Sequence, residues 1–223
     1  QYGDGGSIVT SNLVGHWKLD EGSGQTATDS SGNNNNGTLG STAGSDTNDP
    51  AWTTSGIISN ALSFDGSNDY VNAGDPANGS LDFGTGNLSI AAWMKTGSAN
   101  TMGFIDKRNG SSPADIGYLV SFDGGLGDGI ALSEISDGTN EFYVQNGTAL
   151  HDNRWHHVVV VFDRSNANNS FMYVDGRDAT TGRVGTMPTG SISNAISFNM
   201  GRYQLTNLVF SGLIDDVRVY NRA

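Results

Sequence analysis

Short runs of β-forming residues alternate with clusters of Gly, Asn, Asp and Ser along almost the whole of this 223-residue chain. A helical period near 3.6 residues is nowhere sustained, so helix is expected to be a minor component. Short strands separated by turn signals in this way are typical of a β-sandwich or a β-barrel. Gly occurs 32 times and Pro only 4 times, which fits a chain with many tight turns. The pattern predicts an all-β fold.

Two of the runs carry apolar residues on both faces of a strand. They are NLSIAAWMK at 87–95 and WHHVVVVFD at 155–163. Strands of this kind lie inside a sheet that is covered on both sides. Trp93 and Trp155 are therefore expected in the core. A third run, SFMYV, is followed by Asp175-Gly176, a dipeptide that predicts a two-residue hairpin turn.

No shift in composition marks a boundary between domains. The polar stretch SNANNS at 165–170 is interpreted as a hairpin loop. A single domain over residues 1–223 is predicted, with residues 1–11 as an N-terminal extension or linker. The N-terminus QYGDGGS has neither the basic nor the apolar region of a secretion signal.

The composition excludes several classes of function. A formal charge of −12, from 11 basic and 23 acidic residues, argues against a nucleic-acid partner, which requires a basic surface. The absence of Cys excludes a disulfide scaffold, a thiolate zinc site and a cysteine nucleophile. The longest apolar run, VVVVF at 158–162, is far shorter than the ~20 residues that span a bilayer, so no membrane insertion is expected.

Two distant segments raise the question of a bound ion. The first, DSSGNNNNGTLG at 29–40, contains backbone-bending residues and oxygen donors. The second, GLIDDVRVY at 212–220, places Asp215 by alternation on one face with Leu213, Val217 and Val219, which predicts that it points inward. An unpaired buried carboxylate costs several kcal/mol, so it requires a partner. Either a hard cation such as Ca²⁺ joins the two segments, or the loop is mobile and Asp215 binds a backbone amide.

Six separated motifs, in order, resemble laminin-G-like domains of the concanavalin A-like lectin/glucanase superfamily, from about residue 12 to the end. They are WKLDEGSGQTATDSSGNNNNGTLG, ALSFDGSNDYVNAG, NLSIAAWMK, RWHHVVVVFD, MYVDG and GLIDDVRVYNRA. The resemblance implies a jelly roll of two antiparallel sheets. It also implies a structural Ca²⁺, for which the matching positions are Asp29, Asn34, Gly37 and Asp215. The Asn run differs from the alternating Asn/Gly loop that is usual in the family, which leaves the amide ligand open.

Catalytic signatures are missing. A retaining glycosidase needs two carboxyl groups about 5–5.5 Å apart, but Glu134 and Asp137 are three residues apart and fall on opposite faces of a strand. The chain has no GxSxG motif. His156 and His157 at a strand end are expected to be structural, and His16 and His151 have no ligand spacing. The segment GGLGDGI at 124–130 is interpreted as a loop and DGSNDYV at 65–71 as a turn.

Binding is the function that remains. Aromatic faces with amide, carboxylate or guanidinium partners are the side chains that hold a sugar. The candidates near loops are Tyr203, Arg202, Tyr118, Trp52, Arg108 and Asn207. The prediction is a noncatalytic, calcium-stabilised carbohydrate-binding module, attached to other domains of a secreted or cell-surface protein. The alternatives are a protein-recognising adhesion module and a structural spacer.

Overall fold

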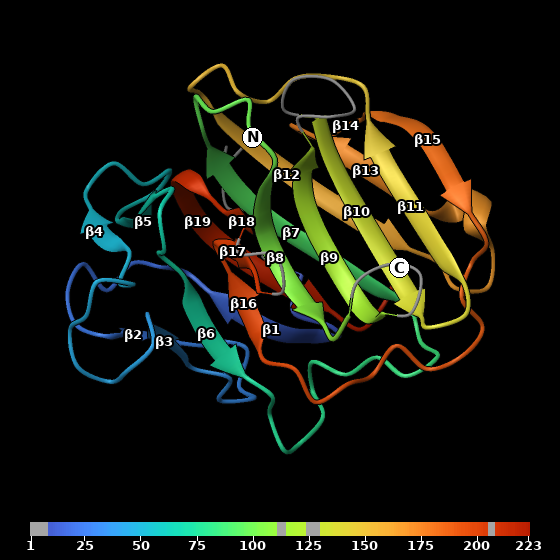
Figure 1. The fold of residues 1–223 in the computed structure, drawn as a ribbon, viewed down its shortest axis with the longest axis horizontal. Coiled ribbons are helices and arrows are strands. Elements are labelled where there is room, and N and C mark those ends of the chain that lie inside the picture. The colour runs from blue at the N-terminus through green and yellow to red at the C-terminus, as the bar shows by residue number, and fades with distance from the viewer. Residues whose placement is uncertain (1–8, 111–114, 124–129, 205–207) are drawn as a thin grey trace.

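The structure is a computed structural model that describes residues 9–110, 115–123, 130–204 and 208–223. Strands make up nearly all of its regular structure, and the one helix among the described residues is a single 3₁₀ turn, η1 (Ala167–Asn169). Two antiparallel sheets are stacked on each other, as Figure 1 shows, with β8 to β11 crossing in front of β7 and β12. The all-β sandwich predicted from the sequence is confirmed.

One sheet has eight strands in the order β14-β13-β12-β7-β19-β5-β4, with β1 also paired to β19. Its strands are β1 (Leu13–Trp17), β4 (Ala51–Thr53), β5 (Ala61–Asp65), β7 (Leu88–Lys95), β12 (Trp155–Phe162), β13 (Phe171–Val174), β14 (Arg177–Asp178) and β19 (Ser211–Tyr220). The last strand, β19, therefore lies inside this sheet and contacts β1, β5 and β7.

The second sheet has nine strands in the order β15-β11-β10-β9-β8-β16-β6-β3-β2. Its strands are β2 (Thr26–Ala27), β3 (Gly37–Leu39), β6 (Val71–Gly74), β8 (Met102–Arg108), β9 (Ile116–Asp123), β10 (Ile130–Asp137), β11 (Glu141–Asn146), β15 (Thr180–Gly185) and β16 (Phe198–Met200). A separate pair, β17 (Arg202–Tyr203) and β18 (Leu208–Val209), contacts β8.

The core lies between the two sheets and is rich in aromatic rings. Trp17 is fully buried, stacks on Phe198 at 5.1 Å between ring centroids, and donates from its indole nitrogen to the carbonyl of Asn35. Phe104, from the nine-stranded sheet, packs against Phe210 at 5.4 Å. These contacts connect the two layers through apolar surface, the dominant favourable term in folding.

The eight-stranded sheet is not covered on both faces in the way the sequence predicts. On β12, Val158, Val160 and Phe162 are buried in the core, whereas the alternate residues are only partly buried. Trp155 and Trp93 lie on this outward face and are partly exposed, so the prediction that both are core residues is wrong. The hairpin prediction is confirmed, because Asp175 and Gly176 both have positive φ and join β13 to β14.

A β-bulge in β19 reverses the predicted direction of Asp215. Asp216 has φ of 50°, and the register with β7 shifts between Asp215 and Arg218. The extra residue lets Ile214 and Val217 both enter the core. Asp215 consequently points away from the core, not inward with Val217 and Val219 as alternation alone predicts.

Candidate ligand-binding face

The outer face of the nine-stranded sheet, the face turned away from the core, carries a row of polar side chains. Cross-strand pairing aligns them from β3 to β11. In order, the row is Thr38, Asn72, Asn199, Asp106, Leu119, Glu134 and Tyr143. The intervening residues face the core, as Val71, Ile105 and Ile135 show. Six of the seven positions can hydrogen-bond, and three of them, Asn199, Asp106 and Glu134, are buried, which a merely solvated surface does not require.

A hollow of about 340 Å³ lies over β3 and β6 at one end of this row. Its lining is mostly amide and hydroxyl groups, from Asn36, Thr38, Ser41, Thr42 and Asn72. Such groups donate and accept hydrogen bonds without a net charge. The hollow therefore suits a neutral polar ligand.

The β17–β18 pair places two of the predicted ligand-binding residues, Arg202 and Tyr203, beside the row. Gly103 makes this possible, because a Cβ there would lie 2.0 Å from the backbone nitrogen of Tyr203. Arg202 places its guanidinium 3.3 Å from the ring centroid of Tyr70 and donates to Asn199 Oδ1 at 3.2 Å. Asn199 is thereby linked to both Asn72, its cross-strand neighbour, and Arg202.

Arg108 is the centre of a buried ionic cluster on the same face. Its guanidinium pairs with Asp115 at 2.6 Å, with Glu134, and with the hydroxyl of Tyr203 at 2.7 Å. Burial raises the pKa of Glu134 to about 7, despite the neighbouring guanidinium of Arg108. Burial likewise raises the pKa of Asp106 to about 7, although the backbone nitrogen of Gln204 donates to it at 3.0 Å.

The six predicted ligand-binding residues do not all reach this face. Arg108, Arg202 and Tyr203 are brought together on it, as described. The prediction for Tyr118 is wrong, because its side chain is 1% exposed in the core and its hydroxyl donates to the carbonyl of Leu81. Trp52 lies on β4 in the other sheet and donates to the carbonyl of Gly24. Asn207 lies outside the described residues.

Sequence reasoning missed the carboxylates of this face. Asp106, Asp115, Glu134 and Glu141 belong to it, and only Glu134 had been considered, as a partner for Asp137. The alternation in IALSEISD contained the signal, since Glu134 shares a face with Leu132 and Ser136 while Ala131 and Ile135 face the core. What alternation does not give is the identity of the neighbouring strands, which depends on the sheet order.

The four predicted calcium ligands do not form one coordination shell. Asp29 Oδ1 accepts from the backbone nitrogens of His16 and Ser31, and Oδ2 accepts from Asn35 N and Ser31 Oγ, all at 2.9 Å. Four donors therefore occupy the carboxylate. Asn34 is exposed with φ of 60°, and Gly37 is a buried residue of β3. The role that best fits Asp29 is therefore to hold this loop together through hydrogen bonds, and a role as an ion ligand fits less well.

Asp215 keeps one property of an ion ligand. It is 2% exposed, accepts from the backbone nitrogen of Ile57 at 2.7 Å, and lines a cavity of about 220 Å³ together with Asp20 and Asp216. Burial, with further contributions from Asp216 and Asp20, raises its pKa to about 7. The alternative raised by the sequence, a backbone amide partner for Asp215, is thus realised by Ile57, while the cavity leaves room beside the carboxylate.

Two of the histidines, His156 and His16, have carboxylate partners. His156 contacts Asp175 at 2.9 Å and Asp152 at 3.0 Å, and His16 contacts Asp216 at 2.8 Å. The turn predicted at 65–71 is confirmed, because Asp69 Oδ2 accepts from the backbone nitrogen of Asp65. Residues 124–129 of the predicted loop lie outside the described residues.

Comparison with known proteins identifies the family. Residues 65–223 match Laminin_G_3, described as the concanavalin A-like lectin/glucanases superfamily. The chain belongs to the Laminin_G_3 family. No curated protein matches this Laminin_G_3 chain. Within its described residues, no helix is long and apolar enough to cross a membrane.

Solved structures share the fold of this Laminin_G_3 chain at low sequence identity. The binding domain of Paraclostridial Mosquitocidal Protein 1 matches with a TM-score of 0.68 and 16% identity, over 97% of this chain and 50% of that one. Domain 4 of AbnA, a GH43 extracellular arabinanase from Geobacillus stearothermophilus, was solved in complex with arabinotriose. It matches with a TM-score of 0.64 and 18% identity, over 95% of this chain and 93% of that one. The botulinum neurotoxin serotype D ligand-binding domain, in complex with N-acetylneuraminic acid, matches with a TM-score of 0.64 and 13% identity, over 96% of this chain and 48% of that one.

These similarities show the fold, a jelly roll of two antiparallel sheets, as the sequence resemblance implied. The chain spans about half the length of the mosquitocidal and neurotoxin binding domains. It spans nearly the whole of the arabinanase domain.

Proposed function

We propose that this chain is a noncatalytic module that binds a glycan on the outer face of its nine-stranded sheet. The observation that carries the proposal is the amide- and hydroxyl-lined hollow, continued through Asn72 and Asn199 to Arg202. A neutral sugar presents hydroxyls that such groups bind, and its C–H surface requires an apolar or aromatic contact. The lining of the hollow includes Ala43, which offers apolar surface for such a contact.

The similar structures support this reading. One was solved with arabinotriose and another with N-acetylneuraminic acid. Among the described residues, those that line the hollow include no carboxylate, so a neutral or weakly charged saccharide is the ligand class proposed here. Residence in a larger secreted or cell-surface protein is part of the same proposal, supported by the extracellular enzyme and toxin domains that share the fold.

Calcium stabilisation is a second part of the proposal. The support is the buried Asp215 carboxylate, which shares a cavity with Asp20. An ion there would be held by Asp215 with Asp20, not by Asp29, and would balance the buried charge. Such an ion would lie on the eight-stranded sheet and would have a structural role, separate from the glycan face.

A protein-recognising role has less support in the described residues. Their largely exposed large hydrophobics are Val9, Ile58 and Val184, which belong to different parts of the fold and form no shared patch. An adhesion surface of standard size would need a contiguous apolar centre.

A glycan array followed by calorimetry tests the proposal. The expected result is binding to one saccharide class, lost in Thr38→Val and Asn72→Ala. Thr38→Val preserves shape while removing the hydroxyl from the hollow. Asn168→Ala, at an exposed asparagine within η1, between β12 and β13 of the other sheet, is the matched control and should bind like the wild type. Silence across neutral and acidic glycans would contradict the proposal and favour protein recognition or a spacer.

A further inference from the structure

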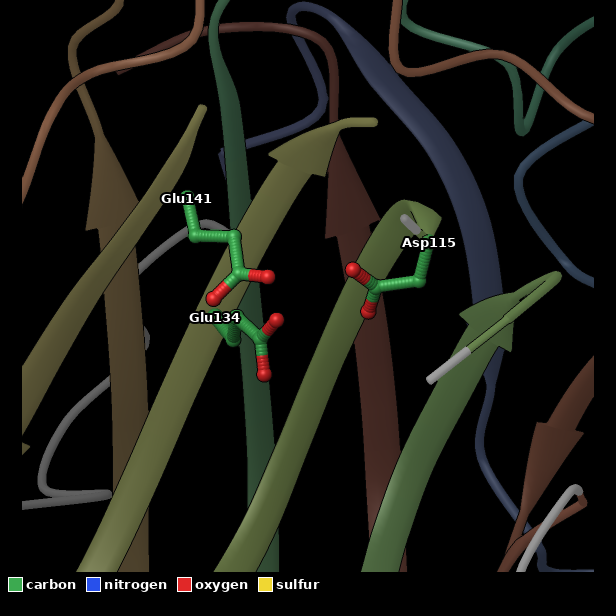
Figure 2. Close-up of side chains that lie close together, drawn as sticks. All are labelled: Asp115, Glu134 and Glu141. Carbon is green, nitrogen blue, oxygen red and sulfur yellow. The ribbon is translucent and has the colours of Figure 1, made fainter. Parts of the chain in front are cut away.

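Three carboxylates converge on the outer face of the nine-stranded sheet, at a distance along the row from the hollow. Glu134 on β10, Glu141 at the start of β11 and Asp115 just before β9 point toward one another (Figure 2). One oxygen from each lies within 4.8 Å of the others. Oxygens that bind the same Ca²⁺ at about 2.3–2.6 Å can be no more than about 5 Å apart. The spacing is therefore that of ligands to one ion.

The charges around these carboxylates do not balance. Arg108 pairs with Asp115 and Glu134, and the guanidinium of Arg202 attracts Asp106. With Glu141 included, four carboxylates face two guanidinium groups. When all four carboxyl groups are ionised, as binding to a cation requires, the excess is two negative charges in a region where Asp106, Asp115 and Glu134 are almost completely buried. Uncompensated charge at such a site is costly.

Some oxygens of these buried carboxylates also lack a hydrogen-bond donor among the described residues. Asp115 is 0% exposed and Glu134 is 4% exposed. Within the described part of the chain, neither Asp115 Oδ1 nor Glu134 Oε1 has a hydrogen-bond donor. Buried carboxylate oxygens in proteins nearly always have a partner. Both oxygens belong to side chains that are directed into the cluster (Figure 2).

We propose that Asp115, Glu134 and Glu141 bind a hard divalent cation, with Ca²⁺ as the best match. All three donors are carboxylate oxygens, the ligand type of Ca²⁺, and no histidine or cysteine takes part. A divalent ion supplies the two positive charges that the cluster lacks. Arg108 then fixes the far oxygens of Asp115 and Glu134 as an outer partner. The site is distinct from the Asp215 cavity, which is on the other sheet, and does not depend on glycan binding.

The test uses CaCl₂ alone and the whole chain, in an Asp215→Asn background that removes the other candidate site. Calorimetry should show one calcium bound per chain. Glu141→Gln, at the least buried of the three carboxylates, and Glu134→Gln should each weaken it by at least about tenfold. Glu21→Gln, an exposed glutamate that is the only other one in the chain, is the matched control and should leave the affinity unchanged.

A second readout locates the ion. The hydroxyl of Tyr143 donates to Glu141, so a Tb³⁺ ion held by the cluster should show luminescence sensitised by this tyrosine. Glu141→Gln should abolish that emission even if Glu134→Gln fails to fold. No calcium binding in the Asp215→Asn chain up to about 10 mM, beyond the weakest extracellular calcium modules, would overturn the proposal. Equal affinity in folded Glu141→Gln and its parent would overturn it as well.

Discussion

His16 and Asp216 are joined by a 2.8 Å contact between imidazole Nε2 and carboxylate Oδ1, although the two residues are 200 positions apart in the chain. Both are buried, and the guanidinium of Arg218 also pairs with Asp216. The carboxylate that makes these contacts belongs to the bulge of β19. Asp216 thus determines which residues of β19 face the core, and it also attaches β19 to β1.

Asp216→Ala is expected to destabilise the fold by about 3 kcal/mol. The substitution leaves the buried His16 and the partly buried Arg218 without their carboxylate and puts Ala at a φ of 50°, a region that Asp and Asn tolerate better. Asp216→Asn keeps the backbone preference and one acceptor, so its loss should be clearly smaller. Urea unfolding of both variants checks this order. Equal losses would show that neither the backbone preference nor the remaining acceptor of Asn matters.

Gly103→Ala should move β17 away from β8. The added Cβ would lie 2.0 Å from the nitrogen of Tyr203, which the backbone cannot accommodate without shifting. A loss of about 1–3 kcal/mol in the free energy of unfolding is expected from such overpacking, together with weaker glycan binding. Gly97→Ala is the control, because Gly97 follows β7 of the other sheet and a Cβ there meets nothing closer than 3.8 Å. An unaltered glycan affinity in Gly103→Ala would exclude β17 from the binding face.

Tyr118→Phe separates a core role from a binding role. Removing the hydroxyl that donates to the carbonyl of Leu81 should cost about 1–2 kcal/mol of stability. Glycan affinity should not change, since the ring lies in the core. Thermal unfolding and calorimetry on the same preparation check both parts. Reduced affinity with unchanged stability would restore Tyr118 as a ligand-binding residue.

Asp215→Asn should remove the calcium-dependent rise in Tm when it is made in a Glu141→Gln background, where the outer-face cluster no longer contributes. Calcium at about 100 times its dissociation constant stabilises by about 2.7 kcal/mol. For a domain of this size, each kcal/mol corresponds to roughly 2–4 °C. Asp178→Asn, on the exposed strand β14, is the control. An undiminished rise in the Asp215 variant would reject this carboxylate as an ion ligand.

The stability that His156 contributes should depend on pH. Burial lowers the pKa of His156, but hydrogen bonds to Asp175 and Asp152 outweigh it and raise the pKa above 6.5. A histidine whose pKa is higher in the folded state than in the unfolded state stabilises the fold fully at pH values below its unfolded-state pKa. This stabilisation is lost as the pH rises through its folded-state pKa. His156→Gln should therefore cost more at pH values below about 6.5 than well above it. The partners are half exposed, so the difference should be about 1 kcal/mol or less. A cost that grows with pH would contradict the assignment.

Local sequence rules predicted what depends on local structure. The hairpin at Asp175-Gly176, the turn at Asp65 and the buried half of β12 all follow from neighbouring residues. The orientation of Asp215 could not be predicted in this way, because a single residue, Asp216, enters a left-handed conformation and shifts the alternation. Trp93 and Trp155 were misplaced for another reason, since an apolar residue on an outer face resembles a core residue in sequence.

The candidate site was harder to predict than the strands. Arg108, Arg202 and Tyr203 were recognised as candidates, but their acidic partners were not. Glu134 and Asp115 approach Arg108 only because β8, β9 and β10 are neighbours in the sheet. This adjacency is a property of topology, which the order of motifs along the chain does not contain.

The position of β19 has a consequence for the order of events during synthesis. Because β19 separates β7 from β5 and also pairs with β1, the eight-stranded sheet cannot close until the ribosome has released residues 211–220. Until then β5 and β7 expose edges that can pair with other chains. A nascent chain stalled before this segment should remain sensitive to protease, and a few further residues should convert it to a resistant domain.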